Sequence, residues 1–438
     1  MTKPEALCKK LGFIFDATIC IFNQENEVMS EESVFKNKAK ELYGLLCEKE
    51  WNPYVTGVIV AFFSVMIMAW WRPWGAVGAI RNWGDWIMFG GASLFGSEAG
   101  VFAYYDEAPR SILVASGSVI GIGFVVGAFI SACLGKDFAL RIPPYREMVK
   151  AVIAGLLMGI GATLAGGCNV GGFYNALGNL AANGFTMMFG MVFGVILGLK
   201  FLYLEMEHIT WGDGGSKIIS FPAKVQYILG AAGILGIIAA AYTYAGNEDS
   251  DYIASLSGII LIAACLGYTM QRGRWCMVQG FREPHMTGDC TLAKSVMLSI
   301  VIVAIGAAVL KYAVPVRAEG EAVLAAANYV SPTFGWGGIV GGFIFGLGAM
   351  FAGGCGSGTL WRVGEGQVKL MMVVPFFAIS ASVMKAWISD EEYVLGKAVY
   401  MPDALGYGPT LLIVAGAMVL WYLVVTWNEE TNKLIVPM

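Results

Sequence analysis

The feature that most limits what this chain can fold into is a series of apolar runs, each close to twenty residues long. We count ten of them, at roughly 54–71, 112–134, 148–166, 184–204, 224–243, 254–271, 291–314, 335–353, 370–388 and 408–427. A helix of about twenty apolar residues crosses the hydrocarbon core of a bilayer and satisfies its own backbone hydrogen bonds. Apolar residues form 57% of the chain and charged residues 14%, which excludes an ordinary soluble domain. The sequence predicts an all-α polytopic membrane protein.

The regions outside these runs are short or charged. Two uncharged stretches, near 86–96 and 168–182, are too short to span a bilayer, and we expect re-entrant or interfacial short helices there. Residues 1–52 are charged and contain neither a span nor the pattern of a secretory signal. They are expected to form a cytosolic or membrane-surface helical extension, either as an amphipathic helix over 11–22 or as a small cytosolic cap.

Lysine and arginine are unevenly distributed among the connections between spans. Most of them fall in the N-terminal segment and in the even-numbered loops of a ten-span arrangement. The positive-inside rule then predicts a multi-pass protein of the cell inner (plasma) membrane with both termini in the cytoplasm. The net charge of −4 gives no indication of a nucleic-acid partner.

Two cysteine motifs are similar enough to indicate an internal duplication. MGIGATLAGGCNVGG, which contains Cys168, and FGLGAMFAGGCGSGT, which contains Cys355, share the pattern GxGAxxAGGCxxG at the end of an apolar run. Cys168 follows the third span and Cys355 the eighth, an odd number of spans apart, so the two copies point in opposite directions through the membrane. We therefore predict two inverted five-span repeats, 53–246 and 247–438, an architecture typical of transporters.

The glycines beside these cysteines indicate a break in the helical structure. Glycine lets the backbone turn sharply and approach other helices closely, and broken backbone at membrane depth is tolerated where it lines a cavity or is buried in protein. If a short helix begins at each cysteine, its free N–H groups and positive dipole end surround the thiol and attract anions. We therefore predict an anion site around both cysteines and the glycines that precede them, Gly166, Gly167, Gly353 and Gly354.

Other roles are open to the remaining cysteines. Buried cysteines usually act as small hydrophobic residues, which is our interpretation of Cys133, Cys265 and Cys290. Cys276 follows the first span of the second half, where Asp85 stands at the matching place in the first half, and its role stays open. A metal site that gathers cysteines and His285 lacks the usual ligand spacing. Thiol redox chemistry needs a close cysteine pair, which the sequence lacks and only folding could supply.

Charged residues close to the spans are few, and several lie beside cysteines of the second half: Arg272, Arg274, Arg282, Glu283, Arg362 and Glu365. The functional interpretation is a vestibule on the inner side that attracts an anion. The alternative is ordinary interfacial anchoring of a cytoplasmic loop, which accounts equally well for any single arginine.

Three segments of the sequence resemble a known family. They are GxGAxLAGGCNVGGFYNAL (159–177), RxxWCMVQGFREPHMTGDCTLAK (272–294) and FGLGAMFAGGCGSGTLWRVGEGQ (345–367). From about Trp51 to its C-terminus, the chain is similar to the YeeE/YedE or sulphur-transport family of bacterial and archaeal inner-membrane proteins. The last two segments look most like the YedE branch, which is linked to selenium metabolism, whereas YeeE itself is associated with thiosulfate uptake.

The resemblance implies an hourglass of spanning and short helices, in which cysteines near the constriction hand a sulfur-containing ion inward through weak thiol contacts. By position, Cys168 and Cys355 match the motif cysteines, and Cys276 matches the cysteine after the first span of the second half. The expected substrate-binding residues are Cys168, Cys355, Cys276, Gly166, Gly167, Gly353, Gly354, Asn169 and Arg274. No catalytic residue, metal ligand or cofactor is expected.

Two departures from the family pattern affect the expected partners. About fifty N-terminal residues have no counterpart in the family, and no sulfur-carrier domain follows the last span. A cytosolic sulfur-carrier partner would therefore be a separate protein.

These features together predict a non-enzymatic inner-membrane transporter or channel that takes up a small sulfur-containing anion by a relay of cysteine thiols. Thiosulfate is the first candidate and a selenium species the second. The sequence has no P-loop, so uptake is expected to be passive or gradient-coupled. The alternatives are a membrane thiol enzyme that passes sulfur as a persulfide, and a structural subunit with no cavity between its halves.

Overall fold

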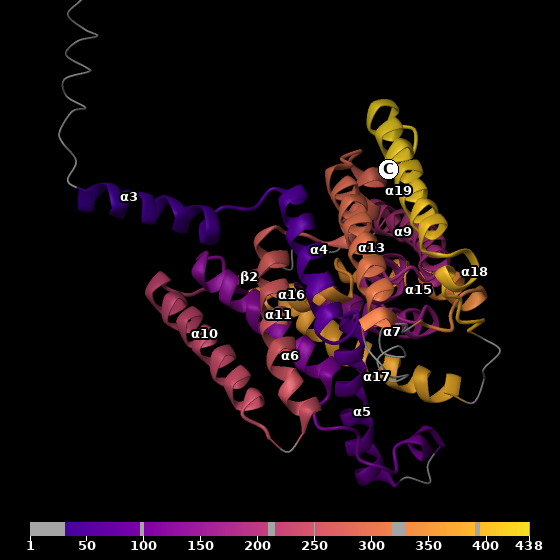
Figure 1. The fold of residues 1–438 in the computed structure, drawn as a ribbon, viewed down its shortest axis with the longest axis horizontal. Helices are drawn as coiled ribbons and strands as arrows, with labels where there is room; N and C mark the ends of the chain where they lie inside the picture. The colour runs from indigo at the N-terminus through magenta and orange to yellow at the C-terminus, as the bar shows by residue number, and fades with distance from the viewer. Residues whose placement is uncertain are drawn as a thin grey trace, which may run out of the picture. The chain divides into compact units, whose positions relative to one another are not determined.

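The computed structural model describes residues 31–96, 100–208, 215–248, 250–317, 330–389 and 395–437 (Figure 1). The chain up to Lys49 and the chain from Glu50 onward form two units, and each is described by itself. The first contains α3 (Glu31–Tyr43) and the π-helical turn η1 (Gly44–Glu48). The amphipathic helix considered for 11–22 lies outside the described residues.

The described part of the second unit consists mainly of helices and carries two short strands. In chain order its elements are α4 (Pro53–Trp70), α5 (Ala76–Phe95), η2 (Gly100–Tyr104), α6 (Ser116–Leu134), β1 (Ala139–Ile142), α7 (Tyr145–Leu164), η3 (Asn169–Tyr174), α8 (Asn175–Gly178), α9 (Asn183–His208), β2 (Lys217–Ser220), α10 (Ala223–Ala245), α11 (Asp251–Arg272), α12 (Met277–Met286), α13 (Thr291–Arg317), α15 (Trp336–Ala352), α16 (Gly356–Glu365), α17 (Val368–Ser389), α18 (Met401–Leu405) and α19 (Tyr407–Thr431).

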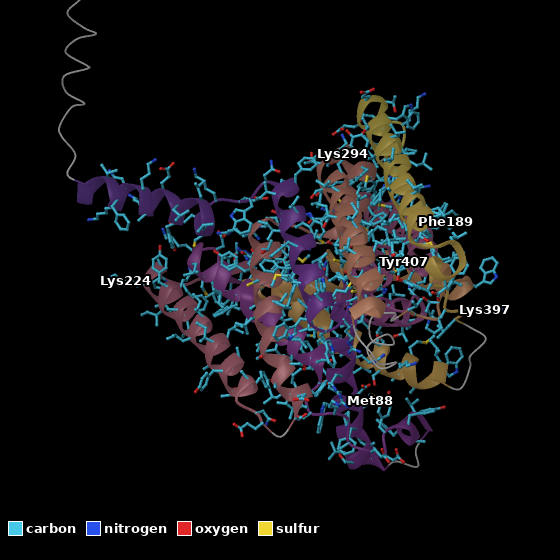
Figure 2. All side chains as sticks on the ribbon, viewed as in Figure 1. Met88, Phe189, Lys224, Lys294, Lys397 and Tyr407 are labelled. Carbon is cyan, nitrogen blue, oxygen red and sulfur yellow. The ribbon has the colours of Figure 1, made fainter. Side chains whose placement is uncertain are left out.

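Ten segments of the described chain are long and apolar enough to cross a membrane. They are Pro53–Trp70, Ser116–Leu134, Tyr145–Gly178, Asn183–His208, Ala223–Ala245, Asp251–Met286, Thr291–Tyr312, Trp336–Glu365, Val368–Ile388 and Tyr407–Thr431. Each coincides with one of the ten predicted runs, so the prediction of a polytopic membrane protein is confirmed. Large apolar side chains lie on the outside of these helices, as Phe189 on α9 does with 58% of its surface exposed (Figure 2). Such exposure is expected where lipid replaces water as the solvent.

Three of these segments join a long helix to a short one, and a cysteine lies at each junction. Cys168 separates α7 from η3 and α8, Cys276 separates α11 from α12, and Cys355 separates α15 from α16. Each cysteine has an extended backbone and precedes the first residue of the short helix. The short helices predicted after Cys168 and Cys355 are therefore present.

A left-handed backbone residue stands two positions before each of the three cysteines. Gly166 has φ of 75°, Gly353 has φ of 80°, and Arg274 has φ of 49°. Glycine adopts this conformation without steric cost, so the two glycine motifs turn the chain out of the long helix at the place where the sequence predicts a break. Arg274 adopts the same conformation with a side chain attached, which is uncommon for a residue other than glycine.

Helix α5 differs from its prediction. The stretch near 86–96 is the second half of a 20-residue helix that begins at Ala76. Arg81 and Asp85 interrupt the apolar run but not the helix, because charged side chains are compatible with helical backbone. Asp85 accepts a hydrogen bond of 2.6 Å from Ser382 on α17, so it lies in a helix interface rather than beside a cysteine.

The strands β1 and β2 form an antiparallel pair with Ala139 opposite Ser220 and Ile142 opposite Lys217. They lie in the connections that follow α6 and α9, outside the ten candidate spans. The described chain is therefore helical across the spans except at the three cysteine junctions, and it adds this short strand pair, which the sequence analysis did not foresee.

Small residues set the spacing between the long helices. A Cβ added at Gly267 on α11 would lie 1.9 Å from the carbonyl oxygen of Phe124 on α6, and one added at Gly127 would lie 1.9 Å from that of Ala264. The α9–α15 pair repeats this arrangement at Gly190, whose added Cβ would lie 2.0 Å from the carbonyl oxygen of Ile339. Close backbone approach of this kind is the usual basis of helix association in membranes, where lipid removes the hydrophobic drive between helices.

Candidate functional site

Three thiols from three different helix junctions meet in the interior of the second unit. The sulfur atoms of Cys276 and Cys355 lie 3.7 Å apart, and both side chains are fully buried. Cys168 is also buried and lies against Gly356, the residue after Cys355; a Cβ added at Gly356 would lie 2.9 Å from the Cys168 sulfur. The structure therefore brings together the two predicted motif cysteines and Cys276, and it supplies the close thiol pair that the sequence lacks. We call these three residues the thiol cluster.

The beginnings of four short or medium helices surround the thiol cluster. The N–H group of Gly358 donates a 3.2 Å hydrogen bond to the Cys355 sulfur, within the first turn of α16. Backbone N–H groups from the first turn of η3 and from Ala76 and Val77, which begin α5, face the Cys168 sulfur. Helix α12 begins directly after Cys276. Because free N–H groups and the positive dipole end lie at helix beginnings, this arrangement attracts anions without a fixed cation at the thiols.

Two glycines of α16 make room for the thiol contacts. A Cβ added at Gly358 would lie 2.8 Å from the Cys276 sulfur and 3.2 Å from the Cys355 sulfur. Gly356 leaves the corresponding space for Cys168. The sequence GCGSG within the second motif therefore packs three sulfur atoms around the first turn of one helix.

A cavity of about 390 Å³ reaches the thiol cluster at Cys168. Gly166 and Gly167 also line it, together with the beginning of α5. Its other polar lining residues include Arg72, Arg81, Thr163, Asn175, Asn179, Asn183, Ser331, Thr333 and Lys385. The charged members of this set are all cationic, so the cavity that reaches Cys168 favours a negatively charged occupant. We call it the cationic cavity.

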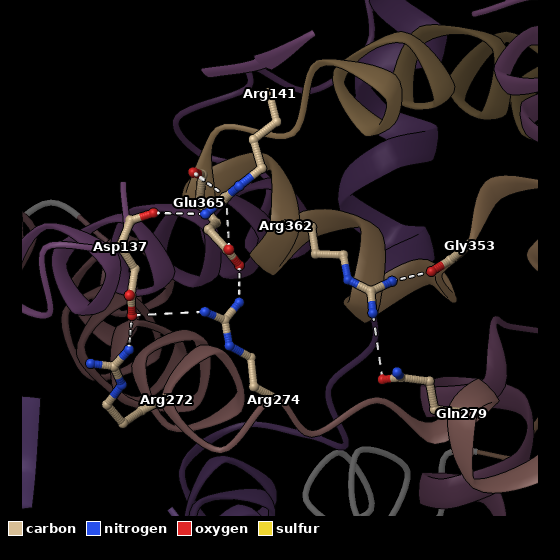
Figure 3. A network of polar contacts seen from close by, with 8 residues as sticks. All are labelled: Asp137, Arg141, Arg272, Arg274, Gln279, Gly353, Arg362 and Glu365. Carbon is tan, nitrogen blue, oxygen red and sulfur yellow. Dashed lines mark hydrogen bonds and ion pairs between the residues drawn. The ribbon is translucent and has the colours of Figure 1, made fainter. Parts of the chain in front are cut away.

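A network of charged side chains lies near α16 and the end of α11 (Figure 3). Glu365, which is 2% exposed, forms ion pairs with Arg141 at 2.8 Å and with Arg274. Asp137 pairs with Arg272, and Arg274 is 3.7 Å from the same carboxylate. We call these five residues the charged network. It connects the end of α16, the end of α11 and β1, so it holds the junction that carries Cys276 against the far end of the helix that begins after Cys355.

The turn before each motif cysteine is held by a different group. In the Cys355 turn, Arg362 donates to the carbonyl oxygen of Gly353 and, at 3.4 Å, to the side chain of Gln279 on α12 (Figure 3). In the Cys168 turn, the hydroxyl of Thr333 donates a 3.1 Å hydrogen bond to the carbonyl oxygen of Ala165. One turn therefore carries a fixed cation and the other a neutral hydroxyl.

The remaining predicted site residues lie in several environments. Gly354 packs against the Arg362 guanidinium, and Arg274 lies in the charged network, where it pairs with carboxylates and faces the Trp361 ring at 5.8 Å. Asn169 is fully buried directly after Cys168, and neither polar atom of its side chain has a hydrogen-bond partner within the described chain. An orphaned amide in this position is unusual for a buried polar group.

The alternative gathering of metal ligands does not occur among the described residues. The Cys290 thiol donates to the carbonyl oxygen of Val425 at 3.2 Å, and His285 contacts the carbonyl oxygen of Leu434 at 2.9 Å. Within the described ranges no group of three or more histidine, cysteine or acidic side chains is placed to hold a metal ion. Burial raises the pKa of Cys290 to about 11, so this thiol stays neutral near pH 7.

The sequence analysis missed the cationic cavity. Trp74 and Trp275 each donate a 2.9 Å hydrogen bond to a serine hydroxyl, and each precedes the residue that caps a helix, Gly75 for α5 and Cys276 for α12. Gly75 and Cys276 therefore stand in similar local settings, a likeness that the sequence analysis did not use. The shared spacing of tryptophan and valine in WGAV and WCMV is the signal that could have revealed this.

Ten candidate spans that enclose a buried thiol cluster and a cationic cavity define a multi-pass membrane protein. Comparison with known proteins identifies the class: the sulphur transport family matches residues 7–197 and 272–437, which include all three thiol-cluster cysteines. The match begins at residue 7, so the expectation that the first fifty residues have no counterpart in the family is wrong. The chain belongs to the sulphur transport family.

Individual relatives match at modest identity. The probable transporter YedE of Escherichia coli (strain K12) is 26% identical over 326 residues, which cover 72% of this chain and 76% of that protein. The thiosulfate transporter TsuA of the same strain is 34% identical over 132 residues, 30% of this chain and 34% of that protein. TsuA of Spirochaeta thermophila (strain ATCC 700085 / DSM 6578 / Z-1203) is 29% identical over 182 residues, 37% of this chain and 52% of that protein.

Proposed function

We propose that this protein takes up a small sulfur-containing anion of the thiosulfate class, which enters the cationic cavity and passes the thiol cluster. The observation that carries the proposal is the meeting of Cys168, Cys276 and Cys355 at helix beginnings, at the end of a cavity whose charged lining residues, among those that the structure describes, are all cationic. The names of the TsuA relatives support thiosulfate as the first substrate to test, and a selenium species is the second.

The chemistry of a thiol suits a relay site. The S–H group is a weak donor and the sulfur atom is polarizable, so a thiol can replace part of the hydration of a sulfur anion without holding it tightly. Conduction requires that each site release what it binds. Helix dipoles supply positive potential at the thiols. The fixed cations lie on either side of the thiols, in the cationic cavity and at Arg362.

The direction of transport follows from the proposed topology. We retain the two inverted repeats, 53–246 and 247–438, and the cytoplasmic location of both termini. The cationic cavity then opens to the outside, and the charged network lies on the inner side. The anion meets Gly166, Gly167, Asn169 and Cys168 first, then Cys355, Cys276 and the turn of Gly353 and Gly354, with Arg274 beside the exit. A separate cytosolic sulfur-carrier protein would receive it.

Uptake into proteoliposomes tests the proposal. Radiolabelled thiosulfate would be offered to vesicles that contain the unmodified protein, Cys168→Ala, Cys276→Ala or Cys355→Ala. We expect each variant to lower the initial rate by at least about tenfold, which corresponds to the loss of one favourable contact. Cys265→Ala is the matched control, because this cysteine lies apart from the thiol cluster and is exposed on α11. Unchanged uptake in all three cluster variants would refute a role for the thiols.

The 3.7 Å contact between Cys276 and Cys355 favours a second candidate function, sulfur transfer. One thiolate attacks the outer sulfur of thiosulfate, which forms a persulfide and releases sulfite. The second thiol then attacks the persulfide, forming a disulfide and releasing hydrosulfide, and a cytosolic thiol reductant must restore the pair. Peptide mass spectrometry after incubation with thiosulfate distinguishes the two functions: transfer leaves a persulfide or a disulfide on these residues, and transport leaves both thiols unchanged.

A further inference from the structure

Lys311 is an amine buried within a candidate membrane span. It lies near the end of the span Thr291–Tyr312 on α13, and its residue surface is 3% exposed. Its ammonium group donates a 3.2 Å hydrogen bond to the carbonyl oxygen of Asn179 and lies 4.4 Å from the centre of the Tyr400 ring. Ionisable side chains inside membrane spans are costly, and they are functional candidates by default.

Lys311 combines burial with the lack of a carboxylate partner within the described chain, whereas the span lysines without an ion pair, Lys200, Lys224 and Lys385, are exposed. Among the described residues, no acidic group lies within ion-pair distance of Lys311, whereas three other lysines at span positions each have one: Lys150 with Glu205, Lys294 with Glu429 and Lys369 with Glu147. A buried ammonium without an ion pair has only dipoles and aromatic rings to compensate for its lost hydration. These groups stabilise the charge less than water does. A negative charge placed nearby would therefore stabilise its protonated form.

The place for such a negative charge lies directly beyond the hydrogen bond that Lys311 makes. Asn179 ends α8, the short helix that follows Cys168, and it lines the cationic cavity. A proton on Lys311 thus puts a positive charge immediately behind the cavity wall. An anion in the cavity and a proton on Lys311 attract one another across this wall.

We infer that Lys311 is a proton-binding site coupled to the anion in the cationic cavity, so that anion binding is accompanied by proton uptake. This inference rests on the proposed function, and it adds that anion uptake is coupled to the proton gradient. Coupling of two binding sites is reciprocal, so the proton tightens anion binding to the same degree that the anion tightens proton binding. Import of a dianion into a cell with a negative interior is electrically unfavourable, and each proton carried with it removes one of the opposing charges.

Within the described part of the chain, few other titratable groups face Lys311. Helix α13 packs against α4, α8, α12 and α19, and neither α8 nor the last turns of α4 carry a titratable side chain. Arg72, which follows α4, donates to Ser116 on α6. Asp403 on α18 is the described carboxylate whose charge acts on Lys311. The hydroxyl of Tyr400 donates a hydrogen bond to the hydroxyl of Tyr407. Burial raises the pKa of Tyr400, so the phenol whose ring contacts Lys311 stays un-ionised.

The test measures proton uptake when sodium thiosulfate binds to the full-length protein in lipid nanodiscs. Calorimetry in two buffers of different ionisation enthalpy gives the number of protons bound with each anion. We expect proton uptake for the unmodified protein and an affinity that weakens with rising pH, by up to about tenfold per pH unit for one coupled proton. Lys311→Arg keeps the charge permanently, so it should retain binding and lose both the proton uptake and the pH dependence. Lys311→Met should bind more weakly, also without proton uptake.

Lys224→Met is the matched control, because Lys224 is exposed at the start of α10 (Figure 2), and it should behave like the unmodified protein. Proton uptake that persists in Lys311→Arg would overturn the inference, as would thiosulfate binding without proton uptake in the unmodified protein. In both of these results the proposed function still stands. Absence of any thiosulfate binding by the unmodified protein would instead refute the proposed function, and the coupling with it.

Discussion

At the scale of single residues, the thiol cluster depends as much on missing side chains as on the three cysteines. Gly356 and Gly358 occupy the first turn of α16, where a methyl group would overlap the sulfur atoms of Cys168, Cys276 or Cys355. The sequence pattern explains this only in part: it identifies glycine as the residue that breaks a helix, whereas these two glycines lie inside one and serve close packing.

Gly358→Ala should abolish most of the transport without unfolding the protein. The added Cβ would lie 2.8 Å from the Cys276 sulfur, so the two inner thiols must move apart. We expect the uptake rate to fall by about tenfold or more, as a lost contact of roughly 1.4 kcal/mol implies. Gly416→Ala on α19 is the control, since its added Cβ meets nothing within 4 Å. Equal uptake by both variants would mean that the thiol contacts do not matter.

Arg362 should act as a positioning residue for the Cys355 turn. It donates to Gly353 and Gln279, so its removal frees the turn and the first residues of α16. Arg362→Gln should increase the rate at which a neutral maleimide modifies Cys355, and Arg362→Lys should restore part of the protection because it retains the charge and one donor. The rate would be followed by peptide mass spectrometry. If Arg362 only stabilises another part of the structure, its replacement should leave the modification rate of Cys355 unchanged.

At the scale of elements, the positions of the helices were largely readable from the sequence and their interruptions only partly so. Length and hydropathy located all ten spans, because the bilayer demands about twenty apolar residues per crossing. The glycine motifs located the breaks at Cys168 and Cys355. The break at Cys276 is made by Arg274 in a left-handed conformation, which no composition rule predicts, and the start of α5 was obscured by Arg81 and Asp85.

Gly267→Ala should destabilise the contact between α11 and α6. Its Cβ would lie 1.9 Å from the carbonyl oxygen of Phe124, so the two helices must separate. Overpacking of a tight interface costs about 1–3 kcal/mol, and the variant should unfold at a lower temperature in detergent. Gly236→Ala on α10, where an added Cβ meets nothing within 4 Å, should be neutral or slightly stabilising, since alanine favours helix. Similar unfolding temperatures for both variants would contradict this account of the interface.

At the scale of the whole molecule, the site is formed by residues that are distant in the sequence. Arg72 and Arg81 flank the start of α5, Asn175 lies on α8, and Lys385 lies on α17, yet all four line one cavity. Apolar periodicity carries no information about such a gathering, because it arises from how the helices pack. The sequence could predict that Cys168 and Cys355 lie in similar turns, since a shared glycine motif marks them, but not the cationic cavity beside Cys168.

The proposed topology predicts that the thiols are reached from opposite sides of the membrane. In oriented vesicles, a membrane-impermeant anionic methanethiosulfonate reagent added outside should modify Cys168, and the same reagent added inside should modify Cys276 or Cys355. The cationic reagent of the same size should react more slowly with Cys168, because the charged residues of the cavity are all cationic. Modification of all three cysteines from one side only would contradict the inverted arrangement.

The different groups that hold the two cysteine turns have an electrical consequence. A hydroxyl from Thr333 secures the first turn, and a guanidinium from Arg362 secures the second. On the proposed route, the anion would therefore pass from a turn without a fixed charge to one that carries a positive charge. Such an electrical asymmetry would make the current in one direction differ from that in the other, as in a diode, without any movement of the helices.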